Sequence, residues 1–247
     1  MTFWDHLDEL RGVLLRVLAV VAACSVVAFC LKEPLFSLVL APRDAAFVTY
    51  RVFGAEPFTL HLMNTGLTEQ FAVHVRTAFF AGLLCASPYA LYALFRFVSP
   101  GLYAGERRLG VRLVGSAYVM FLLGALVNYF LLFPLTVCFL GTYQVSPDVA
   151  NMLTLQSYVD TLLGMTLVLG VVFELPVLCW LLARAGWLTA ARMRFFRRHA
   201  FVAILALSAV ITPTTDAFTL FLVAVPVWLL YEGSIFVVAK SACSRKK

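Results

Sequence analysis

The sequence contains few charged residues. Asp, Glu, Lys and Arg together make up 13% of its 247 residues, whereas hydrophobic residues make up 62%. Soluble domains carry roughly 25% charged residues, so this composition excludes an ordinary soluble protein. It is typical of a polytopic membrane protein. A chain of this length has room for about six spans of roughly 20 residues, which form one bundle.

Motifs of metal centres and of intramembrane proteases are also missing. The six cysteines form no C-x-x-C pair, and the histidines have no metal-ligand spacing. The sequence contains no H-E-x-x-H motif and no serine and histidine at an obvious matching depth in the membrane. We therefore expect no metal, no cofactor and no enzymatic activity.

No internal repeat is evident in the sequence, which weakens the case for an inverted-repeat secondary transporter. A transporter that uses Glu174 as a proton site stays open as an alternative. The net charge of +6 does not indicate a nucleic-acid partner here, because the distribution of basic residues follows the loops of a membrane protein.

Apolar segments follow one another along most of the chain. They cover about 13–31, 72–98, 111–140, 158–182, 201–211 and 217–238. We predict an all-α membrane protein whose residues 1–247 form one domain of six transmembrane helices, with short fifth and sixth spans. The uninterrupted apolar run of the fifth segment would form about 17 Å of helix, against a hydrocarbon core of about 30 Å. The first segment follows acidic residues and not a basic region, so we expect it to remain as a span.

Basic residues predict the orientation. Clusters of arginine and lysine follow the second segment, follow the fourth segment and close the chain, at 107–112, 192–198 and 240–247. Lysine and arginine collect in loops that stay in the cytoplasm, so these loops and both termini are predicted to be cytoplasmic. The longest outer loop, 32–70, contains prolines and glycines that would break a long helix, and we expect short helices that form a cap.

Two acidic sites stand close to these basic clusters. Asp5, Asp8 and Glu9 precede the first apolar segment, and Glu106 lies in an arginine-rich loop after the second. If both sites face the same side of the membrane, they can jointly bind a positively charged ligand. Two simpler interpretations stay open: the first acids suit the start of a helix, and Glu106 forms a surface ion pair worth about 0 to 1 kcal/mol.

Glu174 lies inside the fourth apolar segment, two residues before Pro176. A charge at that depth costs about 2.5 kcal/mol or more, so we expect a protonated carboxyl group or a position in a wet groove. One interpretation is structural: a neutral glutamic acid bonded to a backbone carbonyl that Pro176 leaves free. The other is functional, a polar contact for another helix or peptide.

Four short motifs occur along the chain. They are His-Leu-Asp-Glu-Leu-Arg at 6–11, Phe-Val-Ser-Pro-Gly-Leu-Tyr at 97–103 with Glu-Arg-Arg at 106–108, Phe-Glu-Leu-Pro at 173–176, and Thr-Pro-Thr-Thr-Asp at 212–216. Together they resemble the TatC family, the receptor subunit of the twin-arginine protein translocase. The motifs follow the family's order and extend over essentially the whole chain.

The resemblance implies a glove-like, six-helix protein of the bacterial inner membrane. Such a protein binds the twin-arginine signal peptides of folded cargo proteins at the cytoplasmic face, and it is a receptor, not an enzyme. It implies TatA- and TatB-type single-span subunits as partners in export driven by the protonmotive force. Self-association is left open, and no nucleic-acid partner is expected.

The resemblance also implies a cytoplasmic site for the signal peptide. Glu9 and Glu106 would receive the two arginines of the peptide, while Phe97, Leu102 and Arg108 contribute to the same site. Physical chemistry favours this assignment, because a carboxylate accepts two hydrogen bonds from the planar guanidinium fork and a lysine ammonium cannot reproduce that geometry.

Two arginines therefore need two separate carboxylates. Repulsion from Arg107 and Arg108 should discourage other cations at this site. Arg11 and Arg108 are expected to orient the carboxylates.

A second site is implied for a partner subunit. The resemblance assigns Glu174 to a polar contact on the concave face, for a partner helix or an inserting signal peptide. Thr212, Asp216 and Phe218 lie in or beside the turn between the fifth and sixth segments, on the side where the family places TatA or TatB. Asp216 has a simpler interpretation that we favour, the N-cap of the last span.

Overall fold

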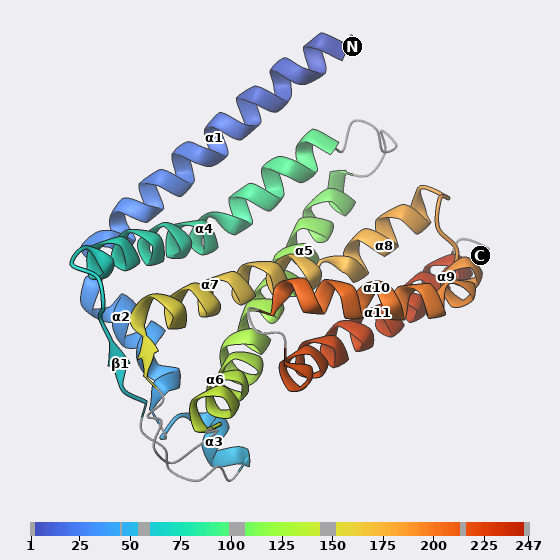
Figure 1. Ribbon diagram of the computed structural model, residues 1–247. Coiled ribbons are helices and arrows are strands. Elements are labelled where there is room, and N and C mark those ends of the chain that lie inside the picture. The colour runs from blue at the N-terminus through green and yellow to red at the C-terminus, as the bar shows by residue number, and fades with distance from the viewer. Residues whose placement is uncertain are drawn as a thin grey trace. The chain divides into compact units, whose positions relative to one another are not determined.

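The computed structural model describes residues 3–44, 46–53, 60–98, 107–143, 152–212 and 216–244, and these residues are almost entirely helical (Figure 1). The elements in chain order are α1 (Phe3–Cys30), α2 (Lys32–Leu40), the 3-10 turn η1 (Ala41–Arg43), α3 (Val48–Phe53), β1 (Leu62–Met63), α4 (Glu69–Val98), α5 (Arg107–Val127), the π-helical turn η3 (Asn128–Leu132), α6 (Phe133–Thr142), β2 (Leu153–Thr154), α7 (Leu155–Val172), α8 (Leu175–Arg184), α9 (Ala190–Phe195), α10 (Arg197–Ile211) and α11 (Ala217–Ser244).

Five helical stretches of the described residues are long and apolar enough to cross a membrane. They are Leu7–Cys30, Glu69–Leu94, Leu113–Thr142, Leu155–Arg184 and Ala217–Lys240. The protein is therefore a multi-pass membrane protein. The fifth apolar segment forms α10, whose 15 residues extend over only about 22 Å. The count of six spans stays a prediction.

The prediction of a short sixth span is wrong. Helix α11 contains 28 residues, which extend over about 42 Å. Pro226 lies inside this helix without ending it. A proline in a membrane helix removes one backbone N–H, and neighbouring groups can satisfy the carbonyl that this leaves without a donor. The helix also continues past the apolar run to Ser244.

The segment 32–70 confirms the expected short helices, α2, η1 and α3. It also contains a feature that the all-α prediction missed. Strand β1 pairs in parallel with β2, with Leu62 opposite Leu153 and Met63 opposite Thr154. Two residues are too few to produce an alternating pattern in the sequence, so periodicity cannot detect such strands.

The chain forms two compact units. Unit 1 comprises Met1–Tyr118 and Gly141–Leu163, and unit 2 comprises Val119–Leu140 and Gly164–Lys247. The third and fourth apolar segments therefore contribute residues to both units.

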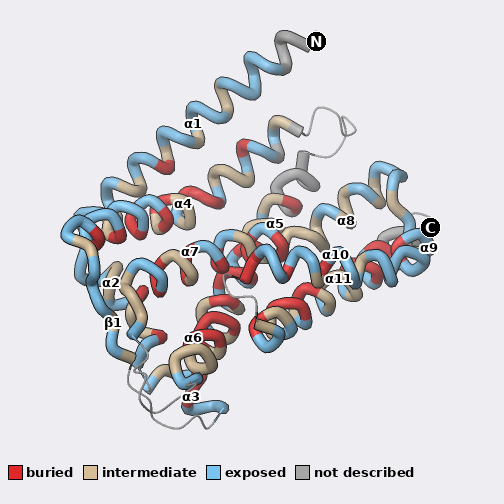
Figure 2. The backbone as a smooth tube through the Cα atoms, viewed as in Figure 1, coloured by how far each residue is buried: buried red, intermediate tan, exposed pale blue. Residues whose placement is uncertain are grey.

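Helices α1 and α4 run antiparallel in unit 1 (Figure 1). Phe29, near the end of α1, stacks on His74, near the start of α4. Farther along, α4 approaches the backbone of α1 closely at Gly82, where an added Cβ atom would lie 2.7 Å from Cα of Ser25. Small residues allow such approaches between membrane helices. The rest of α1 is largely exposed (Figure 2).

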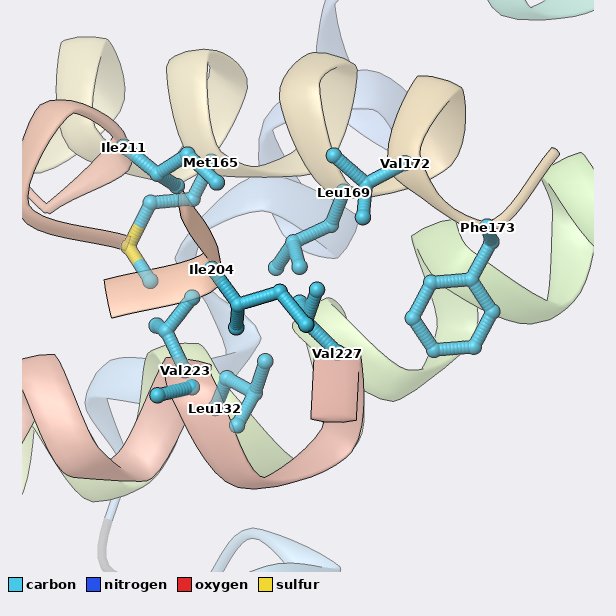
Figure 3. Packing of buried hydrophobic residues seen from close by; sticks show 10 residues of the cluster. Leu132, Met165, Leu169, Val172, Phe173, Ile204, Ile211, Val223 and Val227 are labelled. Atoms are coloured by element: carbon cyan, nitrogen blue, oxygen red, sulfur yellow. The ribbon is translucent and has the colours of Figure 1, made fainter. Parts of the chain in front are cut away.

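Unit 2 is held together by an apolar cluster contributed by several of its helices (Figure 3). The cluster consists of Leu132, Met165, Leu169, Val172, Phe173, Ile204, Ile211, Val223, Ala224 and Val227. Glycine again permits close packing, because an added Cβ atom at Gly124 of α5 would lie 2.8 Å from the carbonyl oxygen of Leu169 in α7. This packing holds the last turn of α7 in place, immediately before Glu174.

Candidate functional site

The first predicted site begins at the amino-terminal end of α1. Glu9 and Arg11 are exposed there, and Phe97 is half-buried near the end of α4. Glu9 precedes Ser25 by 16 residues, and Phe97 follows Gly82 by 15 residues. Because Ser25 and Gly82 touch and the helices are antiparallel, Glu9 and Phe97 both lie about 23 Å from this contact. They therefore belong to the same end of unit 1.

The structure does not describe the side chains of the other predicted residues of this site. Leu102 and Glu106 lie outside the described residues. Arg108 lies in the first turn of α5, and its side chain is not described. The structure thus brings Glu9, Arg11 and Phe97 to one end of unit 1.

Glu174 lies where the fourth apolar segment changes from α7 to α8. The backbone amide of Glu174 donates to the carbonyl of Val171 at 3.1 Å, and the carbonyl of Glu174 accepts from Leu178 at 2.9 Å. Glu174 is thus the N-cap of α8, with Pro176 in the first turn. Proline suits this position because its missing N–H is not needed there. The break divides the membrane span into two helices.

The carboxyl group of Glu174 is partly enclosed. Its Oε1 atom is buried and has no hydrogen-bond partner among the described residues. The structural interpretation, in which the carboxyl group bonds to a carbonyl freed by Pro176, is therefore not supported. A buried polar oxygen without a partner raises the free energy of the free protein, by about 1 to 3 kcal/mol for a neutral group. A ligand that donates a hydrogen bond to it would recover part of that free energy.

The turn between α10 and α11 supplies the remaining predicted residues. Thr212 is buried, and its hydroxyl donates to the carbonyl of Ser208 at 3.0 Å. Asp216 accepts the backbone N–H of Thr219 at 2.8 Å and the hydroxyl of the same residue at 2.7 Å. This geometry confirms Asp216 as the N-cap of α11.

Phe218, by contrast, is 44% exposed and stacks on Phe139 with ring centroids 4.3 Å apart. The first turn of α11 therefore offers an aromatic surface at Phe218, while Thr212 and Asp216 use their polar atoms to hold the ends of α10 and α11.

Glu69, the first residue of α4, connects two parts of unit 1. Its Oε2 atom accepts the backbone N–H groups of Thr65 and Gly66, each at 2.9 Å, and the hydroxyl of Thr65 at 3.1 Å. Its Oε1 atom accepts the backbone N–H of Gln156 at 3.0 Å. Glu69 therefore joins the start of α4 to the start of α7. An acid three residues after Gly66, at the start of an apolar run, was the available signal.

Two further polar pairs lie inside apolar segments. Arg76 of α4 forms an ion pair with Asp160 of α7 in unit 1. In unit 2 the amide of Asn128, in the π-helical turn, donates to the hydroxyl of Thr166 at 2.8 Å. Helical periodicity places such residues on a face but does not identify their partners. No group of three or more His, Cys, Asp or Glu side chains suited to a metal occurs in the part of the chain that the structure describes.

Comparison with known proteins gives a consistent answer. A family model described as "Sec-independent protein translocase protein (TatC)" matches residues 5–226. The chain is 36% identical over 232 residues to the TatC protein of Deinococcus radiodurans, covering 93% of this chain and 82% of that protein. It is 34% identical over 235 residues to TatC of Koribacter versatilis, covering 95% and 84%. It is 30% identical over 237 residues to TatCy of Bacillus subtilis, covering 96% and 88%.

Two solved structures also match the chain. The "Crystal Structure of Twin Arginine Translocase Receptor- TatC" matches with a TM-score of 0.79 and 29% identity, covering 96% of this chain and 99% of that one. A second structure of the same receptor, in DDM, matches with a TM-score of 0.79 and 30% identity, covering 94% and 98%. The relatives are named as components of a protein translocase, so this is a transport protein and not a catalytic enzyme. The chain belongs to the TatC family of Sec-independent protein translocase proteins.

Proposed function

We propose that this protein is the receptor that binds twin-arginine signal peptides of folded precursor proteins at the cytoplasmic face of the bacterial inner membrane. The observation that carries the proposal is the family match over residues 5–226, together with the likeness to a crystal structure named as a twin-arginine translocase receptor. With TatA- and TatB-type single-span subunits, the receptor supports export driven by the protonmotive force.

Glu9 and Glu106 accept the two arginines of the signal peptide. Glu9 suits this role because it is exposed at the end of α1 and forms no ion pair with another described residue, so its oxygens are available for a guanidinium. Arg11 lies two residues later on the same helix and orients the carboxylate of Glu9. Phe97 and Leu102 supply apolar contact for the signal peptide, and Arg108 orients the carboxylates.

A binding measurement tests this site. Purified protein with Glu9→Gln or Glu106→Gln is titrated with a labelled twin-arginine signal peptide and with the same peptide carrying two lysines. A hydrogen bond to a charged group contributes about 1.5 to 3 kcal/mol, so each substitution is expected to weaken binding of the arginine peptide by about 10- to 150-fold. Glu33→Gln is the matched control, since Glu33 is an exposed carboxylate on α2, at the other end of α1.

Both substitutions at the site should also reduce the preference for arginine over lysine. Unchanged affinity for the arginine peptide in the protein carrying both Glu9→Gln and Glu106→Gln would refute the proposed site.

The break at Glu174 forms part of a groove for a partner span. Three observations support this: the unsatisfied Oε1 atom of Glu174, the exposed ring of Phe218, and the short helix α10. Thr212 and Asp216 hold the adjoining ends of α10 and α11 beside this groove. A polar side chain from a TatA- or TatB-type helix would donate to Glu174, and Phe218 would contact the same partner.

The orientation follows from the basic clusters. Both termini and the loop that contains Gly105 lie in the cytoplasm, and Asp44 lies outside. A cysteine at Asp44 should react with an impermeant reagent added to intact cells, and a cysteine at Gly105 should react only after the cells are opened. Labelling of position 105 from outside would reverse the assignment.

A further inference from the structure

A cavity of about 530 Å³ lies in unit 1 at the end of α1 opposite the amino terminus. Its lining comes from α2, η1, β1 and the first turns of α4 and α7. The first membrane-crossing stretch ends at Cys30, and the second begins at Glu69. Residues of the lining therefore lie beside the ends of two spans, at the level where the headgroups of the bilayer begin.

The polar part of the lining is positively charged. Lys32 and Arg43 both contribute to it, together with the amides of Asn64 and Gln70 and the ring of His74. Gln70 and His74 are four residues apart in α4, so they lie on the same face of that helix. Among the described residues, the lining thus presents two cations and several neutral polar groups, and it includes no carboxylate.

The imidazole of His74 is held in a fixed orientation. Phe29 stacks on its face with centroids 4.1 Å apart and planes 10° apart, and Phe36 meets it at an edge with centroids 5.6 Å apart. The Nε2 atom is buried and has no hydrogen-bond partner among the described residues. Because this atom is buried, it is shielded from a ligand in the cavity, and His74 contributes to the lining through its packed ring.

Nearby carboxylates form no strong ion pair with Lys32 or Arg43 in the part of the chain that the structure describes. Glu69 adjoins Gln70 but its oxygens already accept hydrogen bonds from Thr65, Gly66 and Gln156. Asp44 lies 3.8 Å from Arg43, with both side chains exposed, and an exposed pair of this kind is weak. Lys32 forms no ion pair within the described ranges. An incoming anion would therefore not need to break a strong ion pair.

The apolar part of the lining decides what kind of anion fits. Phe36, Leu40, Leu62, Met63, Phe71 and Leu155 line the same cavity. A volume of about 530 Å³ falls in the range of sites for ligands much larger than an inorganic ion. A ligand with a phosphate at one end and hydrocarbon at the other would satisfy both parts. Phospholipids have this chemistry, and they are present at the same depth.

We infer that this cavity binds the headgroup of an anionic phospholipid, with the phosphate between Lys32 and Arg43 and the hydrocarbon against Phe36, Leu40 and Phe71. The site is distinct from the signal-peptide site, because Glu9 lies at the other end of α1. Such a lipid would hold α2 and η1 against the start of α4.

Native mass spectrometry on the full-length protein tests the inference. The protein in detergent is mixed with phosphatidylglycerol or with phosphatidylcholine, and the bound lipid is counted. Each basic residue near an anionic lipid contributes about a fivefold increase in affinity, so the protein carrying both Lys32→Gln and Arg43→Gln should bind phosphatidylglycerol about 25-fold more weakly. Arg51→Gln is the matched control, since Arg51 is an exposed cation of α3 that does not line the cavity.

A second measurement guards against a variant that is merely unstable. Added phosphatidylglycerol should raise the melting temperature of the unaltered protein and of the Arg51→Gln protein, and it should raise that of the double variant less. Millimolar inorganic phosphate should not displace the lipid.

Equal binding of the two lipids, equal binding by the double variant, or full displacement by inorganic phosphate would each overturn the assignment. The last result would identify a site for the free anion instead.

Discussion

Replacement of Gly82 by alanine tests how α1 is held in unit 1. The added Cβ atom would lie 2.6 Å from the backbone nitrogen and 2.7 Å from Cα of Ser25, whereas ordinary contacts begin at 3.4 Å. Because these atoms belong to the backbone, no change of rotamer can relieve the overlap. The two helices must separate by about 0.8 Å, and a gap of 0.5 to 1 Å already loses a quarter to a half of the dispersion energy of the atoms involved.

The expected change in stability combines two opposing effects. Overpacking of this kind costs about 1 to 3 kcal/mol, and we expect the upper part of that range because backbone meets backbone. Alanine in place of glycine stabilises a helix by about 1 kcal/mol. Gly82→Ala should therefore lower the free energy of unfolding by about 1 to 2 kcal/mol. Gly115→Ala, with no atom within 4 Å of its added Cβ, should raise it by up to about 1 kcal/mol.

Unfolding in mixed detergent micelles, followed by circular dichroism, compares the two variants. Adding Ser25→Ala to Gly82→Ala gives a further check, because it removes the serine hydroxyl and leaves the backbone contacts in place. That double variant should stay as unstable as Gly82→Ala alone. Equal stability of the Gly82→Ala and Gly115→Ala proteins would refute the reasoning, and so would full rescue by Ser25→Ala.

Three other predictions concern the remaining polar and short elements. Glu69→Gln should loosen the pairing of β1 with β2 and speed thiol labelling of a cysteine at Met63, while Glu33→Gln should not; equal labelling rates would contradict the role of Glu69. Glu174→Ala should reduce crosslinking of a cysteine at Phe218 to a partner span more than it reduces signal-peptide binding, and Glu174→Gln should retain most crosslinking because the amide keeps a hydrogen-bonding oxygen. Lengthening α10 by seven leucines, about two helical turns, should impair export with insertion intact; normal export would show that the short helix is not needed.

Features with a local cause could be predicted from the sequence. Residue type and position alone placed Glu174 within a span and made Asp216 the N-cap of the last helix, because both depend on neighbours a few residues away. The short helices of the 32–70 segment followed from its prolines and glycines. The family followed from motifs distributed over the whole chain, and the family match over residues 5–226 confirms it.

Features that depend on distant partners could not be predicted. Gly82 is one of several glycines in apolar segments, and nothing in the sequence indicates that Ser25 lies against it. The role of Glu69 depends in the same way on its contact with Gln156, and the position of the His74 ring depends on Phe29. The unexpected length of α11 has a different cause, since the sequence gives the apolar run but not how far the helix continues beyond it.

Because β1 pairs with β2, one part of unit 1 must form later than another while the chain is synthesised. About 90 residues separate Leu62 from Leu153, and bacteria and other cells synthesise roughly 5 to 20 residues each second. The pair of α1 and α4 needs only the first part of the chain and can form early. The β1 segment and the Gln156 contact of Glu69 wait for about 5 to 20 seconds more of synthesis. During that interval the carboxylate of Glu69 lacks its partner on α7, and this end of unit 1 is complete only when α7 has been synthesised.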